Sequence, residues 1–104
     1  MVTVKISKPE DISKLKLDKN SILLFTMKTC PYCIAMGDEW KKAKRLNAKK
    51  TIYEIQANCV SYLPHKIKKV VYAFPTIAKY NGAKLIMFEG NRTKDSFSSF
   101  MKGV

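Results

Sequence analysis

The feature that most constrains this chain is an apolar run, residues 21–27, that ends just before Cys30-Pro31-Tyr32-Cys33. A continuous apolar run of strand length predicts a strand that is buried on both faces, as in a sheet with helices on either side. Pro31 suits the first turn of a helix, because the N–H that proline lacks has no helical partner there. The sequence therefore predicts a buried strand that leads directly into Cys-x-x-Cys at a helix N-terminus.

This placement favours redox chemistry at the two cysteines. Free backbone N–H groups and the positive end of the helix dipole stabilise a thiolate, and they act on Cys30 more than on Cys33. Such positions lower a cysteine pKa from ~8.5 into the range of ~3.5–7.5. Cys33 lies one helical turn further on, where it can attack a mixed disulfide formed at Cys30. We therefore expect Cys30 to be the nucleophile and Cys33 the resolving thiol.

A metal site is the main alternative for two closely spaced cysteines. A structural zinc site needs four ligands, and the chain adds only Cys59 and its single histidine, His65, as soft ligands. Five residues separate these two, which is not a usual ligand spacing, so we expect no metal and no cofactor beyond the dithiol. An iron–sulfur cluster bridging subunits through Cys30 and external thiols stays open. We expect Cys59 to be a buried structural thiol and His65 a surface residue.

Periodicity and turn residues predict the remaining elements. Strands are expected over 2–6, 51–55, 75–80 and 84–88, and helices over 9–16, 31–46, 61–69 and 94–102. The resulting order is βαβαβαββα, an α/β arrangement with a parallel first part and an antiparallel edge.

Local patterns predict how some elements begin, turn and pack. Ser7 and Glu10 are spaced as a capping box for the first helix. The dipeptide Asn81-Gly82 favours a type I′ turn between the last two strands. Thr93 or Asn91 is placed to cap the last helix, which should bury residues 97, 100 and 101. In the helix over 31–46 the spacing of apolar side chains predicts one broad buried face. Its members are Ile34, Met36, Trp40, Ala43 and Leu46.

Composition limits the domain organisation and the location of the protein. Hydrophobic residues make up 46% and charged residues 27% of 104 residues, as in a globular domain, so we expect a single domain over 1–104. No apolar run reaches the ~20 residues of a membrane span, so we expect no membrane association. The first residues lack the apolar segment of a secretory signal, which predicts a cytoplasmic protein unless a leader has been removed.

The chain is strongly basic, with a formal net charge of +12. Such a charge attracts acidic proteins, nucleic acids and anionic membranes over long distances. The lysines occur in every segment of the chain, which is more typical of a solvated surface than of a single binding face. Because the net charge is positive wherever the lysines lie, we still expect acidic proteins among the partners.

Three segments in the correct order resemble the thioredoxin-fold family, most of all the catalytic domain of protein disulfide isomerases. These segments are FTMKTCPYCIAMGDEW, AFPTIAKYNGAK and FEGNRTKDSFSSFMK, and the resemblance covers about residues 22–101. It implies a thioredoxin fold with a central mixed β-sheet flanked by helices. Trp40 stands at the family's tryptophan position in the active-site helix; if its indole N–H is buried, it needs a hydrogen-bond partner.

The resemblance also implies site residues beyond the cysteines. The Phe74–Pro75 bond is expected to be cis and to face the cysteines, so that its backbone can pair with an extended substrate. With Pro31 and Tyr32, these residues form the expected substrate-binding surface. Arg92 stands where the family has an arginine that approaches the resolving cysteine and lowers its pKa.

The chain departs from the disulfide isomerases at several positions near the cysteines. Leu24 replaces a buried carboxylate that accepts the proton of the resolving cysteine, so Cys33 must lose its proton to water or another group. Arg92 or Lys28 is placed to assist, and Lys28 is also placed to hold a carboxylate or assist the Cys30 thiolate. Thr29 replaces a tryptophan and, like Pro31-Tyr32, is the glutaredoxin choice. The Gly-Gly-x-Asp type turn of the glutaredoxin glutathione site is absent from residues 89–95.

These observations predict a protein thiol–disulfide oxidoreductase, with isomerase or oxidase activity favoured over pure reduction. Its substrates are expected to be cysteine-containing proteins, and glutathione or a thioredoxin-reductase-type donor its electron partner. We expect a monomer. Two alternatives stay open: a glutathione-dependent glutaredoxin-like or thioredoxin-like reductase, and a basic binding module on a thioredoxin fold.

Overall fold

The computed structural model describes residues 2–47 and 49–103, and it has one five-stranded sheet in the order β1-β3-β2-β4-β5. The strands are β1 (Val2–Ile6), β2 (Ser21–Thr26), β3 (Thr51–Gln56), β4 (Thr76–Tyr80) and β5 (Leu85–Met87). β3 is parallel to both β1 and β2, whereas β4 is antiparallel to β2 and to β5. The expected mixed sheet, parallel first and antiparallel at one edge, is confirmed.

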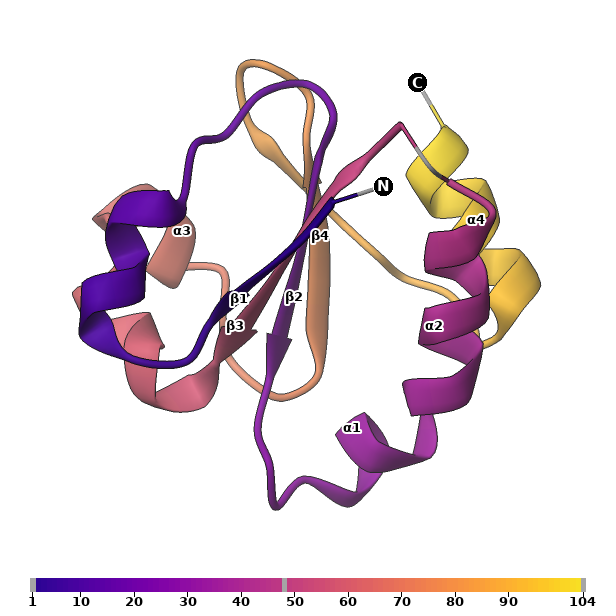
Figure 1. The fold of residues 1–104 in the computed structure, drawn as a ribbon, viewed down its shortest axis with the longest axis horizontal. Helices are drawn as coiled ribbons and strands as arrows, with labels where there is room; N and C mark the ends of the chain where they lie inside the picture. The colour runs from indigo at the N-terminus through magenta and orange to yellow at the C-terminus, as the bar shows by residue number, and fades with distance from the viewer. Residues whose placement is uncertain (1, 48, 104) are drawn as a thin grey trace.

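Helices cover both faces of this sheet, which Figure 1 shows nearly edge-on. On one side lie α1 (Pro31–Ala35), α2 (Gly37–Arg45) and α4 (Lys94–Lys102); on the other lie the 3₁₀ helices η1 (Pro9–Lys14) and η2 (Ala57–Tyr62), with α3 (His65–Lys68). Each side has its own hydrophobic core. Within the described residues, no helix has the length and apolar character needed to cross a membrane.

β2 separates the two cores, as its apolar sequence predicts. Ile22 and Leu24 belong to the core under α2 and α4, whereas Leu23 and Phe25 belong to the core under η1, η2 and α3. All four side chains are buried. Because alternate residues of a strand point to opposite faces, only a continuous apolar run can fill both cores at once.

The single helix expected over 31–46 is wrong, because the chain forms two helices that meet at Met36. Met36, Trp40 and Ala43 are buried, as expected. Ile34 is 67% exposed and Leu46 is 53% exposed, so neither belongs to the buried face. Ile34 lies in α1, before the junction, and Leu46 is the residue at which α2 ends.

Two of the predicted local structures are also wrong. Ser7 and Glu10 do not form a capping box: η1 begins after Lys8, and the backbone N–H of Ser7 donates to the carboxylate of Asp11 at 3.1 Å. The β4–β5 hairpin has a four-residue loop, since Tyr80 pairs with Leu85. A type I′ turn requires two positive φ angles, and among the described residues only Gly82 has one, at +96°.

Of two further predictions about helices, one is wrong and one is confirmed. The helix expected over 61–69 is divided by Pro64, which separates η2 from α3. Thr93 caps α4 as predicted, because its hydroxyl accepts a hydrogen bond from the N–H of Ser96 at 3.2 Å. In α4, Phe97 and Met101 are buried, and Phe100 is partly buried against the same core.

Candidate active site

Cys30 and Cys33 lie where β2 leads into α1, at the lower end of the molecule in Figure 1. Cys30 is the N-cap residue of α1, and its Sγ accepts a hydrogen bond from the backbone N–H of Cys33 at 3.3 Å. The Cys30 thiol also donates to the carbonyl oxygen of Phe74 at 3.4 Å. Both cysteines are free thiols and are almost buried, with 5% and 9% of their surface exposed. The helix N-terminus therefore holds Cys30 in the predicted position.

The environments of the two thiols differ in their effect on acidity. The pKa of Cys30 is lowered, mainly by a hydrogen bond from the Cys33 thiol and further by the backbone N–H groups of Cys33 and Tyr32. These effects outweigh burial, which acts in the opposite direction. The pKa of Cys33 is raised, first by burial and then by the neighbouring Cys30. The geometry therefore favours a thiolate at Cys30 and a protonated Cys33.

The loop before β4 completes the space around Cys30. The Phe74–Pro75 bond is cis, as expected, and the Phe74 carbonyl faces the Cys30 thiol. Phe74 and Pro75 are half-buried, whereas Pro31 and Tyr32 are exposed on α1. The structure thus brings Phe74, Pro75 and the two cysteines together, next to the exposed first turn of α1.

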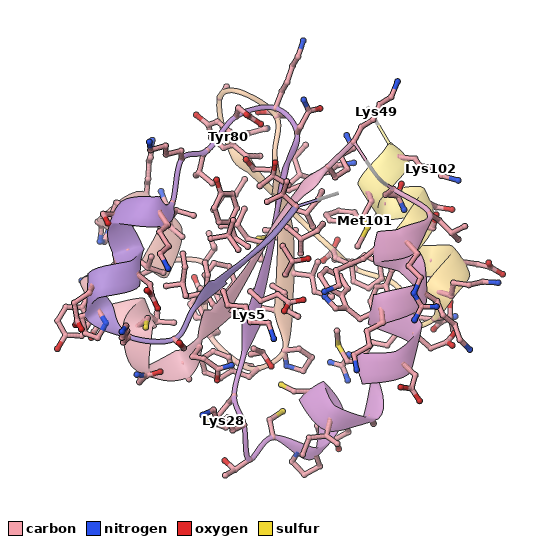
Figure 2. All side chains as sticks on the ribbon, in the orientation of Figure 1. Lys5, Lys28, Lys49, Tyr80, Met101 and Lys102 are labelled. Carbon is pink, nitrogen blue, oxygen red and sulfur yellow. The ribbon has the colours of Figure 1, made fainter. Side chains whose placement is uncertain are left out.

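The two cationic residues expected to modulate the site differ in position. The Arg92 guanidinium lies over the Tyr32 ring, 5.4 Å from its centroid, and its charge contributes to the lowered pKa of Cys30. The charge of Arg92 thus acts on the pKa of Cys30, whereas the resemblance implied an effect on Cys33, for which the structure shows none among its described residues. Lys28 is exposed at the lower end of the molecule in Figure 2, where it lines a shallow cavity with Met27 and Thr29. Among the described residues, no hydrogen bond or ion pair involves its side chain.

A carboxylate lies beside Leu24, on the neighbouring strand. Leu24 pairs in register with Glu54 of β3, whose Oε2 accepts hydrogen bonds from the Trp40 indole at 2.9 Å and from the Lys44 ammonium at 2.7 Å. This contact supplies the partner that the buried indole needs. Leu24, Thr26 and Glu54 all line a cavity of about 270 Å³.

Thr26 connects this cavity to the resolving cysteine. A hydrogen bond between its side chain and Cys33 opposes the rise in the pKa of Cys33. Glu54 was not among the residues expected at the site. The parallel pairing of residues 21–26 with 51–56 would have indicated it, because that register places residue 54 opposite residue 24.

Apolar side chains are exposed around the cysteines. Tyr32 and Ile34 of α1 are largely exposed, as is Tyr72, two residues before Phe74. Met27 lines a shallow cavity of about 420 Å³ that also includes Thr29 and the start of η2. This end of the molecule therefore offers apolar contacts next to the Cys30 thiol.

The third cysteine lies apart from this site. Cys59 is fully buried in the core under η1, η2 and α3. Burial raises its pKa, and the charges of Asp11 and Glu10 act in the same direction. His65 is exposed at the start of α3. Within residues 2–47 and 49–103, no three His, Cys, Asp or Glu side chains are grouped closely enough to hold a metal ion.

Comparisons with known proteins agree with this architecture. The thioredoxin family model matches residues 3–103. A search of curated proteins found no significant match. Among solved structures, the chain is similar to the J-Trx1 fragment of ERdj5, with a TM-score of 0.70, 18% identity, and coverage of 92% of this chain and 49% of that one.

Two further structures have the same fold at low identity. For the zinc-bound form of human ERp44 the TM-score is 0.73 at 8% identity, with coverage of 96% of this chain and 30% of that chain. For a thioredoxin-like protein from Clostridium perfringens the TM-score is 0.63 at 20% identity, with coverage of 96% and 79%. The chain thus spans about half of the ERdj5 fragment and under a third of ERp44. From its family match, its mixed sheet and its Cys-x-x-Cys at the start of α1, this chain belongs to the thioredoxin family.

Proposed function

We propose that the protein is a protein thiol–disulfide oxidoreductase of the disulfide isomerase or oxidase type. One observation carries this proposal: two adjacent thiols have pKa values shifted in opposite directions, with Cys30 lowered and Cys33 raised. The thiolate is the nucleophile in disulfide exchange, so a chain that prepares one thiolate and keeps its neighbour protonated is suited to a two-step exchange.

The reaction begins with the Cys30 thiolate, which attacks one sulfur of a substrate disulfide. The substrate S–S bond breaks, a mixed disulfide forms at Cys30, and the departing substrate thiolate takes up a proton. Cys33 then loses its proton and attacks the Cys30 sulfur, which releases the second substrate thiol and leaves a Cys30–Cys33 disulfide. Two electrons pass to the substrate, and its two sulfurs take up two protons, one balanced by the proton that Cys33 loses and one from solvent. The reverse sequence oxidises a substrate dithiol.

The Cys33 proton needs an acceptor, and we assign this role to Glu54, a carboxylate that lines the same cavity as Thr26. Thr26 contacts Cys33 and lines the same cavity as Glu54. The cavity, at about 270 Å³, has room for several water molecules between these groups. The proposed path therefore runs from Cys33 past Thr26 and through water to Glu54.

The substrate is an extended segment of a cysteine-containing protein. The Phe74 carbonyl accepts a hydrogen bond from the Cys30 thiol in the free protein, and it becomes available to a substrate backbone once Cys30 is a thiolate. Tyr32, Ile34 and Tyr72 offer exposed apolar contacts on either side. When the protein has reduced a substrate, glutathione or a thioredoxin-reductase-type enzyme then returns the Cys30–Cys33 disulfide to the dithiol.

Isomerase or oxidase activity is favoured because groups that stabilise the thiolate of a reduced dithiol make its disulfide more oxidising. Reactivation of scrambled ribonuclease, run beside insulin reduction, tests this. The wild type should reactivate ribonuclease, and Cys30→Ser should abolish both activities. Cys33→Ser should accumulate a mixed disulfide with the substrate. Insulin reduction without ribonuclease reactivation would contradict the isomerase assignment.

The second candidate is a glutaredoxin-like reductase, which the exposed Pro31-Tyr32 dipeptide favours. Turnover of a small glutathione mixed disulfide with glutathione as the reductant separates the two. A rate above that with protein substrates would favour the glutaredoxin assignment. A third candidate, a basic binding module whose cysteines have no role, requires Cys30→Ser to leave every exchange assay unchanged.

A further inference from the structure

Two cavities lie at the end of the molecule opposite the cysteines. The first, of about 330 Å³, is formed where the starts of β2 and β3 meet the end of α4. The second, of about 290 Å³, lies between α3 and the β4–β5 hairpin. Tyr80 lines both. In Figure 2, Tyr80 and Lys102 lie toward the upper end of the molecule, whereas Lys28, two residues before Cys30, lies at the lower end.

Lysines line both cavities. We use the name lysine pole for Tyr80 and the seven lysines that follow. The lysines are Lys19, Lys50, Lys79 and Lys102 at the first cavity and Lys66, Lys69 and Lys84 at the second. None of the described residues that line either cavity is acidic. Seven lysines therefore line two cavities at which the structure describes no carboxylate.

Only one of these lysines has a clear structural role in the fold. The Lys79 ammonium donates hydrogen bonds to the carbonyl oxygens of Phe100 and Gly103, at the end of α4. For the other six, no carboxylate within residues 2–47 and 49–103 lies at ion-pair distance. The nearest acidic residue along the chain, Asp18, accepts hydrogen bonds from the N–H of Asn20 and the hydroxyl of Ser21. The positive potential of the pole is thus left available to a ligand.

We propose that the lysine pole is a docking surface for an acidic segment of a partner protein. Its lysine ammonium groups attract carboxylates as mobile point charges. Ile22 and Tyr80 give the first cavity an apolar wall, which can take an apolar side chain of the same segment. A short acidic peptide with an interspersed apolar residue matches both properties.

A nucleic acid suits this surface less well. Single-strand binders stack successive bases on several aromatic rings, and Tyr80 is the only aromatic residue among those described at the two cavities. Arginine is the usual residue for reading bases and phosphates in a fixed geometry. The two arginines of the chain, Arg45 and Arg92, are not among the residues that line these cavities.

The lysine pole and the cysteines lie at opposite ends of the molecule, so a partner can bind at the pole without covering Cys30. A segment bound at Tyr80 and Lys102 leaves Cys30, at the other end of β2, open to a substrate. The docked partner is therefore either a protein that holds the oxidoreductase in place or a substrate whose cysteines lie distant in sequence from its acidic segment. This inference does not depend on the proposed redox activity, and binding can be measured on the Cys30→Ser variant.

Binding of a labelled peptide tests the proposal. The probe is a fluorescein-labelled peptide of ten residues, eight glutamates and two leucines, followed by anisotropy at two salt concentrations. The triple variant Lys19→Glu, Lys50→Glu and Lys102→Glu should weaken binding about tenfold or more, because three charge pairs become repulsive. The control triple Lys8→Glu, Lys28→Glu and Lys41→Glu makes the same change in net charge on exposed residues elsewhere, and should weaken binding by roughly twofold.

A second measurement locates the peptide without any substitution. Amide chemical shifts of the wild type should change at residues 80–84 and 99–103 on titration and stay constant at residues 29–34. Shifts centred on the cysteines, or equal losses in the two triple variants, would overturn the proposal. Tighter, pole-dependent binding of an oligothymidine or of phosphatidylserine vesicles than of the peptide would overturn it in favour of that ligand.

Discussion

The chain holds its three cysteines in two contrasting environments. Cys30 and Cys33 lie at the start of α1, whereas Cys59 lies in the core on the opposite face of the sheet. All three are buried thiols, and burial alone raises the pKa of each. Only Cys30 has enough hydrogen-bond donors and positive charge around it to reverse that effect. The direction of each pKa shift therefore follows the polar groups around the thiol and not its exposure.

Cys33 and Cys59 make a finer comparison, because the pKa of both is raised. Cys33 has the Thr26 hydroxyl and the backbone of Met27 as partners that favour its thiolate. The charges that act on Cys59, from Asp11 and Glu10, oppose its ionisation. The raised pKa of Cys33 is thus compatible with the proposed step in which it loses its proton, whereas the surroundings of Cys59 favour its protonated thiol.

The largest difference is expected when a cysteine from each environment, Cys30 or Cys59, is replaced by serine. Cys30→Ser should abolish disulfide exchange, because a serine hydroxyl cannot form the mixed disulfide. Cys59→Ser should retain exchange but lower the free energy of unfolding by about 1–3 kcal/mol, since it buries a hydroxyl among apolar side chains. Ribonuclease reactivation and urea unfolding measure the two effects. Loss of exchange in a folded Cys59→Ala variant would contradict the separation of the two sites.

A second, smaller effect is expected at Glu54. Glu54→Gln keeps the size of the side chain and an acceptor for the Trp40 indole but removes the proposed proton acceptor for Cys33. The resolution of the mixed disulfide should slow by about tenfold near neutral pH and recover as pH rises. Rapid acid quenching of a single turnover measures the mixed disulfide that accumulates.

Glu39→Gln is the matched control for this experiment. Glu39 is also a carboxylate on the α2 side of the sheet, hydrogen-bonded to the backbone N–H of Lys94 and paired with Lys42, but it does not line the cavity. This variant should resolve the mixed disulfide at the wild-type rate. Equal slowing in both variants would exclude a specific role for Glu54.

The smallest effect is expected from a substitution at Arg92. Its charge adds to the difference in pKa between Cys30 and the other two thiols. Arg92→Gln removes a positive charge that helps lower the pKa of Cys30. Below neutral pH the alkylation of Cys30 should slow by about two- to threefold, because an exposed charge is screened by solvent. Tyr32→Leu, which removes the ring under the guanidinium, should have an effect in the same direction. An unchanged rate in both variants would show that Arg92 does not act on Cys30.

Much of the fold and the central pair of residues could be predicted from the sequence. The apolar run of β2 requires two cores, and the cap at Thr93 depends on one local hydrogen bond. The junction at Met36 and the four-residue hairpin loop were missed, because neither depends on local residue preferences alone. Glu54 was missed for a different reason: its neighbour Leu24 is 30 residues away in sequence and adjacent only through strand register.

The most direct test of the contrast between the three cysteines is the pH dependence of alkylation in the fully reduced protein. Iodoacetamide is applied across a pH series, and mass spectrometry of the cysteine-containing peptides gives a rate for each thiol. Cys30 should react with a midpoint well below the ~8.5 of a free cysteine, while Cys59 stays unmodified in the folded protein. A Cys30 midpoint at or above ~8.5, or a Cys59 rate equal to that of Cys30, would contradict the proposed origin of its reactivity.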